Sequence, residues 1–261
     1  MKIILLGSGN VATHLGRALL RTEHKVVQVY SRTMANAQTL ASELGCDATD
    51  RVHDVRDDAD VYLFSVKDDA LPLLAREVKH KNGGAVYVHT AGSVRMDVFK
   101  DCAQRYGVLY PMQTFSKSRE LNFREVPCFV EGNDEQALSI INSLAQSLSD
   151  RVVEMSSEKR KSLHLAAVFA CNFTNHCYRL AERVLTDAGI DFSLYLPLID
   201  LTARKVHDMS PREAQTGPAI RYDESVINRH LSMLDDDTMR QIYSLMSQSI
   251  HQDQEKNSHL L

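Results

Sequence analysis

The sequence predicts an α/β fold with a mostly parallel sheet, followed by an all-helical C-terminal domain. From residue 2 to about residue 155, short apolar runs alternate with helical patterns, as happens where helices connect parallel strands. Beyond residue 155 only helical patterns remain. Because 261 residues exceed one minimal domain, we expect two domains, at residues 1–155 and 156–261.

The predicted strands carry apolar side chains at successive positions, which is typical of strands covered on both faces. They are residues 2–6, 25–30, 60–66, 85–89, 107–110, 127–131 and 152–155. Apolar residues recur at helical spacing over 11–19 and 34–44, and Gly45 is a suitable stop for the second of these helices. Both helices are expected to pack on the sheet.

The C-terminal half is predicted to contain long helices. Ser156 can cap a helix that runs to about residue 188. Further helices are expected at 192–209, at 223–234 with Asp223 as the cap, and at 236–250 with Asp235 or Asp236 as the cap. A helix of about thirty residues is longer than a small domain covers. Its free apolar face is therefore expected to pack on a second subunit, in a homodimer formed through the helical domain.

Composition excludes several classes of protein. A net charge of -4 gives the chain no general attraction to nucleic acid. The five cysteines are widely spread without a C-x-x-C pair, which indicates reduced thiols and no zinc or other metal site. The apolar run at residues 3–6 is too short for a signal-peptide core, and no run reaches membrane-spanning length. We expect a cytoplasmic protein with a small-molecule substrate and no nucleic-acid or membrane partner.

A glycine motif, Gly7-x-Gly9-x-x-Ala12, lies directly after the first predicted strand and opens the first predicted helix. In that setting the pattern predicts a dinucleotide site in a Rossmann-type domain, formed by residues 7–11: Gly7, Ser8, Gly9, Asn10 and Val11. The helix N-terminus offers unpaired N–H groups to the phosphates. The alternative is a glycine-rich turn that binds nothing.

The residues after the second predicted strand indicate which cofactor is bound. Sites specific for NAD usually place a carboxylate there, whereas this chain has Ser31, Arg32 and Thr33. The planar guanidinium of Arg32 can bind a 2′-phosphate, and the two hydroxyls can add hydrogen bonds. The cofactor is therefore predicted to be NADP(H), unless Arg32 is simply a solvated surface side chain.

Two further loops follow the carboxyl ends of later strands, where open α/β sheets bind ligands. The first contains Ser65, Val66 and Lys67, and the second contains Thr90 and Ala91. We expect them to flank the ribose and the nicotinamide. Because these residue types are also common in ordinary turns, the spacing alone leaves a purely structural role open.

Five motifs in order resemble the family of Rossmann-like NADP oxidoreductases that carry a helical C-terminal domain of unknown function. They are residues 7–12, 89–93, 111–115, 164–172 and 216–221. The resemblance implies a helical domain like that of the 6-phosphogluconate dehydrogenase and pyrroline-5-carboxylate reductase group, and no particular reaction. The chain departs from the family at Tyr110, where histidine is frequent, and at Tyr222, which replaces the glycine of an Arg-Gly-Asp sequence.

Hydride transfer to a carbonyl or imine needs a group that supplies a proton. The candidates are His89, Tyr110 and His164. His164 and Asn172 are separated by a little more than two helical turns, so one helix face can present both to an interdomain cleft. Asn172 is expected to be buried, where its amide needs a partner. A structural histidine at 164 is the alternative.

Substrate contacts are predicted at Gln113, Thr216 and Arg221. Arg221 follows a Gly-Pro turn and can reach an anionic group, although it can equally pair with Asp223 or Glu224. The related β-hydroxyacid dehydrogenases carry a lysine four residues before the helical asparagine. Here that residue is Val168, which argues against their mechanism.

These observations predict an NADP(H)-dependent oxidoreductase that reduces a small carbonyl or imine in the interdomain cleft. His164 is the leading proton donor, with Asn172 and His89 as further catalytic candidates. The alternative is a non-catalytic dinucleotide-binding sensor or scaffold, which the missing lysine favours.

Overall fold

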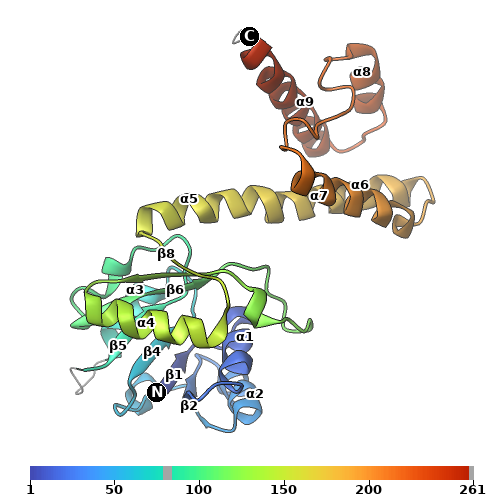
Figure 1. Ribbon diagram of the computed structural model, residues 1–261. Helices are drawn as coiled ribbons and strands as arrows, with labels where there is room; N and C mark the ends of the chain where they lie inside the picture. The colour runs from blue at the N-terminus through green and yellow to red at the C-terminus, as the bar shows by residue number, and fades with distance from the viewer. Residues whose placement is uncertain (79–83, 259–261) are drawn as a thin grey trace. The chain divides into compact units, whose positions relative to one another are not determined.

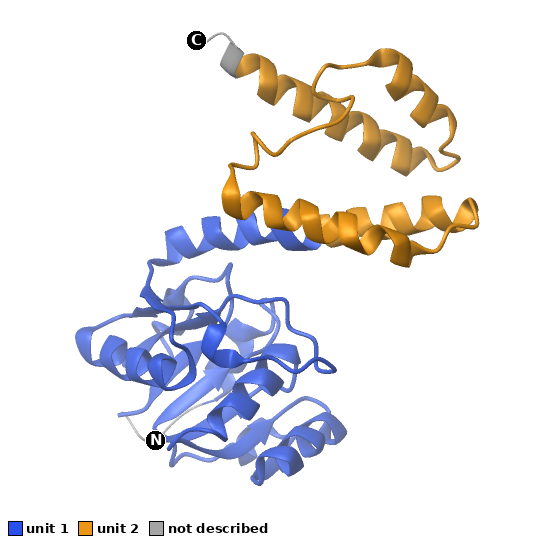
Figure 2. Ribbon diagram, turned by 45° about the vertical axis from the view of Figure 1, so that its right-hand side comes forward, with its two compact units in different colours: residues 1–172 blue, residues 173–261 orange. Residues whose placement is uncertain are grey.

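The computed structural model describes residues 1–78 and 84–258, and the chain divides into two compact units, residues 1–172 and 173–261 (Figure 2). The first unit holds the sheet together with helix α5, Ser157–Ala167. The domain boundary predicted at residue 155 lies between the last strand and α5. By contacts, α5 belongs with the sheet.

The first unit is built on a sheet that has eight strands among the described residues, in the order β3-β2-β1-β4-β5-β6-β7-β8 (Figure 1). All neighbours pair in parallel except β6 and β7, which confirms the predicted mostly parallel α/β fold. The strands are β1 Lys2–Leu6, β2 Lys25–Tyr30, β3 Asp47–Thr49, β4 Val61–Phe64, β5 Val86–His89, β6 Arg105–Pro111, β7 Cys128–Gly132 and β8 Val152–Glu154. Only β3 was not predicted.

Helices cover both faces of this sheet, which is why its strands are apolar at successive positions. Ile3 and Leu5 of β1 pack on one side, in a core shared with α1 Asn10–Leu19, α2 Met34–Leu44 and α4 Glu135–Leu148. Ile4 and Leu6 point to the other side, toward α3 Leu71–Glu77 and the 3₁₀ helix η2 Met96–Phe99. The strand order changes direction between β1 and β4, so their carboxyl ends mark the place where such sheets bind ligands.

The predicted helix ends are confirmed by their caps. Gly45 ends α2 in a left-handed conformation, with φ +66°. The side chain of Ser156 accepts a hydrogen bond from the backbone N–H of Lys159 at the start of α5. Asp223 caps α8 in the same way, and Asp236 receives the backbone N–H of Met239 at the start of α9.

The second unit is helical throughout its regular structure. Its described elements are α6 Thr174–Asp187, the 3₁₀ helix η5 Phe192–Tyr195, α7 Leu196–Asp208, α8 Glu224–Ser232 and α9 Asp237–Ser258. An apolar groove of about 380 Å³ lies between α6 and α9. Across the described part of the chain, no helix combines the length and the apolar character that a membrane crossing requires.

Candidate functional site

The N-terminus of α1 has backbone donors that no side chain caps. Gly9 is the N-cap residue, and the first turn of α1 contains no acidic residue. By contrast, α4 is capped by Asp134, whose carboxylate accepts the N–H of Ala137. A Cβ atom on Gly9 would meet nothing within 4 Å, so the space above the helix end is open. These donors and this open space fit a pyrophosphate group.

Gly7 brings the loop after β1 against the end of β4. Its φ of +124° is a conformation that side chains rarely adopt, and a Cβ atom there would overlap the carbonyl oxygen of Ser65. The N–H of Gly7 donates to the carbonyl of Tyr30 on β2, at 2.8 Å. Glycine is therefore required at position 7 for the three strand ends to meet.

The end of β2 presents an unpaired cation beside this loop. Arg32 is exposed and forms no ion pair with any described residue. The hydroxyl of Ser8 donates a hydrogen bond to the hydroxyl of Ser31 at 2.8 Å, which joins the ends of β1 and β2. Thr33 begins α2 without a side-chain cap bond, so its hydroxyl is available. This arrangement fits a 2′-phosphate at the position predicted for it.

The loops after β4 and β5 are tied to each other. The hydroxyl of Thr90 donates to that of Ser65 at 3.3 Å, and both side chains are buried. Val66 and Ala91 are half-buried, whereas Lys67 is exposed. The structure thus brings the predicted residues to one sheet edge. It also shows that Ser65 and Thr90 hold that edge together.

One face of α1 binds the loop after β6, an interaction that the sequence did not predict. Asn10 donates to the carbonyl of Phe115, Nε2 of His14 lies 2.9 Å from the carbonyl oxygen of Ser116, and Arg17 donates to that of Lys117. The three α1 residues are spaced by four and three positions, so they share a face of the helix. We call these three bonds the α1 latch.

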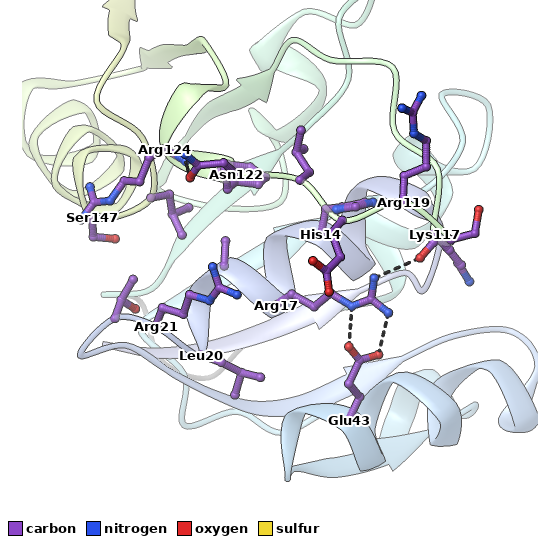
Figure 3. A pocket seen from close by; sticks show the side chains of 17 residues that line it. His14, Arg17, Leu20, Arg21, Glu43, Lys117, Arg119, Asn122, Arg124 and Ser147 are labelled. Carbon is purple, nitrogen blue, oxygen red and sulfur yellow. Dashed lines mark hydrogen bonds and ion pairs between the residues drawn. The ribbon is translucent and has the colours of Figure 1, made fainter.

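A surface cleft of about 830 Å³ lies beside the α1 latch (Figure 3). Figure 3 shows the guanidinium of Arg17 held by Glu43 and by the carbonyl of Lys117. Arg21 and Arg119 also line the cleft. None of the predicted cofactor, substrate or catalytic residues does, so this cleft is separate from the candidate site.

Two predicted proton donors meet in the first unit. The hydroxyl oxygen of Tyr110 lies 3.0 Å from Nδ1 of His164, and the two rings contact each other edge to face. Burial raises the pKa of Tyr110, which keeps its phenol protonated. A Cβ atom on Gly92 would lie 2.6 Å from Nδ1 of His164, so the ring rests directly on that glycine. The motifs at 89–93 and 164–172 therefore touch.

His89 lies in the core, away from solvent. Its side chain is 0% exposed, packs on Phe99, and accepts the backbone N–H of Ala91 through Nδ1. Burial, and next the positive charge of Arg160, lower the pKa of His89 to about 3. An imidazole held neutral in this way fits a structural role at the end of β5 better than proton transfer.

Asn172 is not buried, contrary to the expectation. It lies in a π-helical segment, Val168–Phe173, between α5 and α6, where its side chain is exposed and forms no hydrogen bond with described residues. The change of helical pitch also alters which residues share a face with His164. π-Helical turns occur frequently at functional sites, and nothing in the residue pattern pointed to this one.

The predicted substrate residues differ in their surroundings. Gln113 is exposed and accepts the N–H of Thr114. In the second unit, Thr216 and Arg221 are exposed, and Arg221 does not pair with Asp223 or with any other described acidic residue. His230, also in the second unit, hydrogen bonds to Tyr243 at 2.8 Å.

Tyr222 explains the chain's departure from an Arg-Gly-Asp sequence. Its φ of +49° lies in the left-handed region, which glycine adopts without strain. The tyrosine ring stacks on His251 with centroids 4.9 Å apart, a contact that offsets the strain and that glycine cannot make.

Comparisons with known proteins agree with this architecture. Residues 2–92 match the family model "NADP oxidoreductase coenzyme F420-dependent", and residues 126–250 match a domain of unknown function, DUF2520. A solved structure titled "putative NADP oxidoreductase" from Bacteroides fragilis is 49% identical, covers 96% of this chain and 98% of its own, and has a TM-score of 0.92.

More distant structures share the fold. An imine reductase from Myxococcus stipitatus in complex with NADP⁺ is 14% identical over 100% of this chain and 95% of its own, with a TM-score of 0.65. A 1-pyrroline-5-carboxylate reductase from Streptococcus pyogenes is 13% identical over 98% of both chains, with a TM-score of 0.63. No curated protein sequence matched. The chain belongs to the NADP oxidoreductase family that joins a Rossmann-type domain to a DUF2520 domain.

Proposed function

We propose that this protein is an NADP(H)-dependent reductase of a small carbonyl or imine, with His164 as the proton donor. The observation that carries the proposal is the pair formed by Tyr110 and His164, packed on Gly92. Gly92 lies just beyond the carboxyl end of β5, on the sheet edge that also holds the dinucleotide loop. NADP(H) is the cofactor of the family, and bound at this edge it supplies the hydride.

The pair can supply the proton that accompanies a hydride. When the C=O or C=N carbon accepts the hydride, the oxygen or nitrogen must take up a proton. Because Tyr110 stays protonated, its hydroxyl donates to Nδ1 of neutral His164 and leaves the ring proton on Nε2. In the imidazolium form Nδ1 donates to Tyr110 instead, and the Nε2 proton is free to transfer. Tyr110 thus fixes which nitrogen serves the substrate.

A substrate panel tests this proposal. We would measure NADPH consumption with cyclic imines and small ketones for the wild type, His164→Gln and Tyr110→Phe. His164→Gln should lower kcat by about 10²- to 10⁴-fold while leaving the Kd for NADPH unchanged. Tyr110→Phe should lower kcat less, because it removes only the hydrogen bond that orients the His164 ring. An active wild type with an equally active His164→Gln would exclude His164 from the mechanism.

Imines are favoured as substrates by the solved structures of similar fold. Among them are an imine reductase and a reductive aminase from Aspergillus terreus, titled as a complex with NADPH and ethyl-5-oxohexanoate. Their identity to this chain is only 14%, so they support the class of substrate and no particular compound.

Gln113, Thr216 and Arg221 are proposed to bind the substrate. The unpaired guanidinium of Arg221 supports an acidic group on that substrate. Arg221→Ala should raise KM for carboxylate-bearing imines and leave KM for neutral ones unchanged. An equal rise in KM for the acidic and the neutral imines would show that Arg221 does not recognise the negative charge of the substrate.

A non-catalytic sensor or scaffold is the second candidate function. Two observations favour it: Val168 stands where related dehydrogenases carry a lysine, and the amide of Asn172 has no partner within the described chain. Tight NADPH binding without turnover of any panel compound, together with an unchanged affinity in His164→Gln, would support this alternative.

We also propose a homodimer formed by the helical unit. Leu194, Leu198 and Leu201 follow one another at helical spacing across η5 and α7, and each is more than half exposed. Such an apolar stripe, together with the apolar groove between α6 and α9, is typical of a surface that a second copy covers. Light scattering should give twice the chain mass. Leu198→Asp with Leu201→Asp should give the monomer, and Leu73→Asp on α3 is the exposed control.

A further inference from the structure

We propose that Arg160 and Glu131 are positioning residues that hold His164 against Tyr110. This inference rests on the proposed function, because it concerns how the proton donor is oriented. Arg160 lies on α5 and is fully buried, and its Nη1 atom lies 2.6 Å from Oε2 of Glu131 on β7. A buried guanidinium is costly to desolvate, so its presence needs a reason beyond stability.

The pair ties three separate segments together. The carboxylate of Glu131 also accepts the backbone N–H and the hydroxyl of Ser157, at 2.8 and 2.7 Å, which fixes the start of α5 on the sheet. The Nη2 atom of Arg160 donates to the carbonyl of Val94 at 2.5 Å. Val94 directly follows the motif at 89–93, so the ion pair joins this motif, β7 and α5.

His164 lies one helical turn beyond Arg160, on the same face of α5. Its ring contacts Tyr110 on β6 and Gly92, which lies two residues before Val94. Both side chains therefore reach the segment after β5, and on the sheet Arg160 binds β7 while His164 contacts the neighbouring strand β6. A slide or rotation of α5 would break the contacts of both side chains. We infer that the buried pair sets the register in which Nδ1 of His164 meets the Tyr110 hydroxyl.

The first test needs no substrate. In the wild type, Tyr110→Phe should shift the ¹⁵N resonance of His164 Nδ1 in NMR, because it removes the bond at that nitrogen. In the double variant Glu131→Gln with Arg160→Met, the same Tyr110→Phe change should give no shift. This double variant leaves no unpaired buried charge, and the amide oxygen introduced at position 131 still accepts from Ser157. An equal shift in both backgrounds would overturn the proposal.

A matched control is available on the same helix. Arg95 pairs with Glu158 in the first turn of α5, but both side chains are about half exposed or more. Arg95→Met with Glu158→Gln should therefore leave the coupling between Tyr110 and His164 intact. If this exposed pair removed the coupling as fully as the buried one, the effect would be general loosening of α5 and the proposal would be wrong.

The second test uses activity once a substrate is found. Glu131→Gln with Arg160→Met should lower kcat by about 10- to 100-fold, as misplaced catalytic groups do, with the Kd for NADPH unchanged. The single variant Arg160→Lys keeps a positive charge paired with Glu131 but loses the planar fork that also reaches Val94. Its kcat should therefore lie between those of the wild type and the double variant. Unchanged kcat in the double variant would contradict the proposal. If no compound is reduced but the NMR coupling behaves as expected, the proposed reaction fails while the positioning role stands.

Discussion

Gly92 and His164 show how single residues from distant motifs make the candidate site. The imidazole rests where a Cβ atom of residue 92 would be, so glycine is needed at that position for the ring to reach Tyr110. Gly92 is not among the glycines with positive φ. Glycine is therefore needed there because the His164 side chain packs so closely, and not because of the backbone conformation.

Gly92→Ala should displace the His164 ring and lower kcat by about 10- to 100-fold without changing the Kd for NADPH. Steady-state kinetics with a fluorescence titration of NADPH measures both. Gly45→Ala is the control, since a methyl group there meets no atom within 4 Å. It should cost about 1 kcal/mol of stability through its left-handed φ and leave activity unchanged. Full activity in Gly92→Ala would exclude the close packing.

Arg32 is the residue proposed to select NADP(H) over NAD(H). Arg32→Ala should weaken NADPH binding by about 10-fold or more, as the loss of a charged hydrogen bond does, and leave NADH binding nearly unchanged. Titration calorimetry with both dinucleotides checks this. Equal losses for the two would contradict a contact with the 2′-phosphate.

His89 should make the protein sensitive to acid. Its pKa falls from an ordinary 6.5 to about 3 on folding, so between these values the unfolded chain binds a proton that the folded chain does not. Stability is therefore lost as the pH falls from about 6.5 toward 3, by about 3 kcal/mol at pH 4. Urea unfolding of His89→Asn across this range should show a flatter pH dependence than the wild type. Parallel curves for the two proteins would show that His89 is not held neutral.

The residues of the site differ in how far the sequence could predict them. Gly7, Gly9 and Arg32 directly follow the first two predicted strands, so the strand pattern was enough to expect them at one edge of the sheet. His89 and His164 look alike in the sequence, and only burial separates a neutral core histidine from one that faces Tyr110. A contact between such distant residues leaves no trace in local spacing.

At the scale of elements, the α1 latch links the dinucleotide loop to the loop after β6. Three side chains of one helix face bind three successive carbonyl groups, those of residues 115–117. His14 also packs its ring on Phe115, with centroids 5.2 Å apart. The α1 latch thus ties the start of α1 to Phe115, the last residue of the motif at 111–115.

His14→Phe should loosen this loop while preserving the ring contact. It removes the bond to Ser116 and should cost about 1 kcal/mol of local stability. Hydrogen exchange measured by mass spectrometry should then be faster in residues 112–120 and unchanged in β1. Arg51→Ala, at an exposed position away from the latch, is the control. Unaltered exchange in the loop would show that the latch does not hold it.

Many elements could be predicted, and those that were missed show where local patterns fail. Short apolar runs and helical spacing identified seven strands, the helices α1 and α2 and the helices of the C-terminal half, whereas α3 and α4 were expected only as connections between strands, without residue ranges. β3 has only three residues, two of them polar, so it forms no apolar run and is made by pairing with β2. The π-helical segment at Val168–Phe173 has an ordinary helical composition, and its pitch depends on tertiary packing.

At the scale of the whole molecule, the chain joins a unit with a complete core to one with an incomplete core. The first unit buries both faces of its sheet, whereas the second exposes leucines along α7 and an apolar groove between α6 and α9. The first unit can therefore fold around its own core, and the exposed apolar surface of the helical unit is the basis of the proposed homodimer.

In the proposed reaction a hydride passes from C4 of the nicotinamide to the substrate carbon, and an isotope label follows that transfer. NADPH carrying deuterium at C4 is incubated with the imine and ketone panel, and the products are analysed by mass spectrometry. Direct hydride transfer should give a product that gains a single deuterium at the former C=N or C=O carbon, at a rate that His164→Gln lowers sharply. Tight NADPH binding without deuterium in any product would contradict it and would support the sensor or scaffold instead.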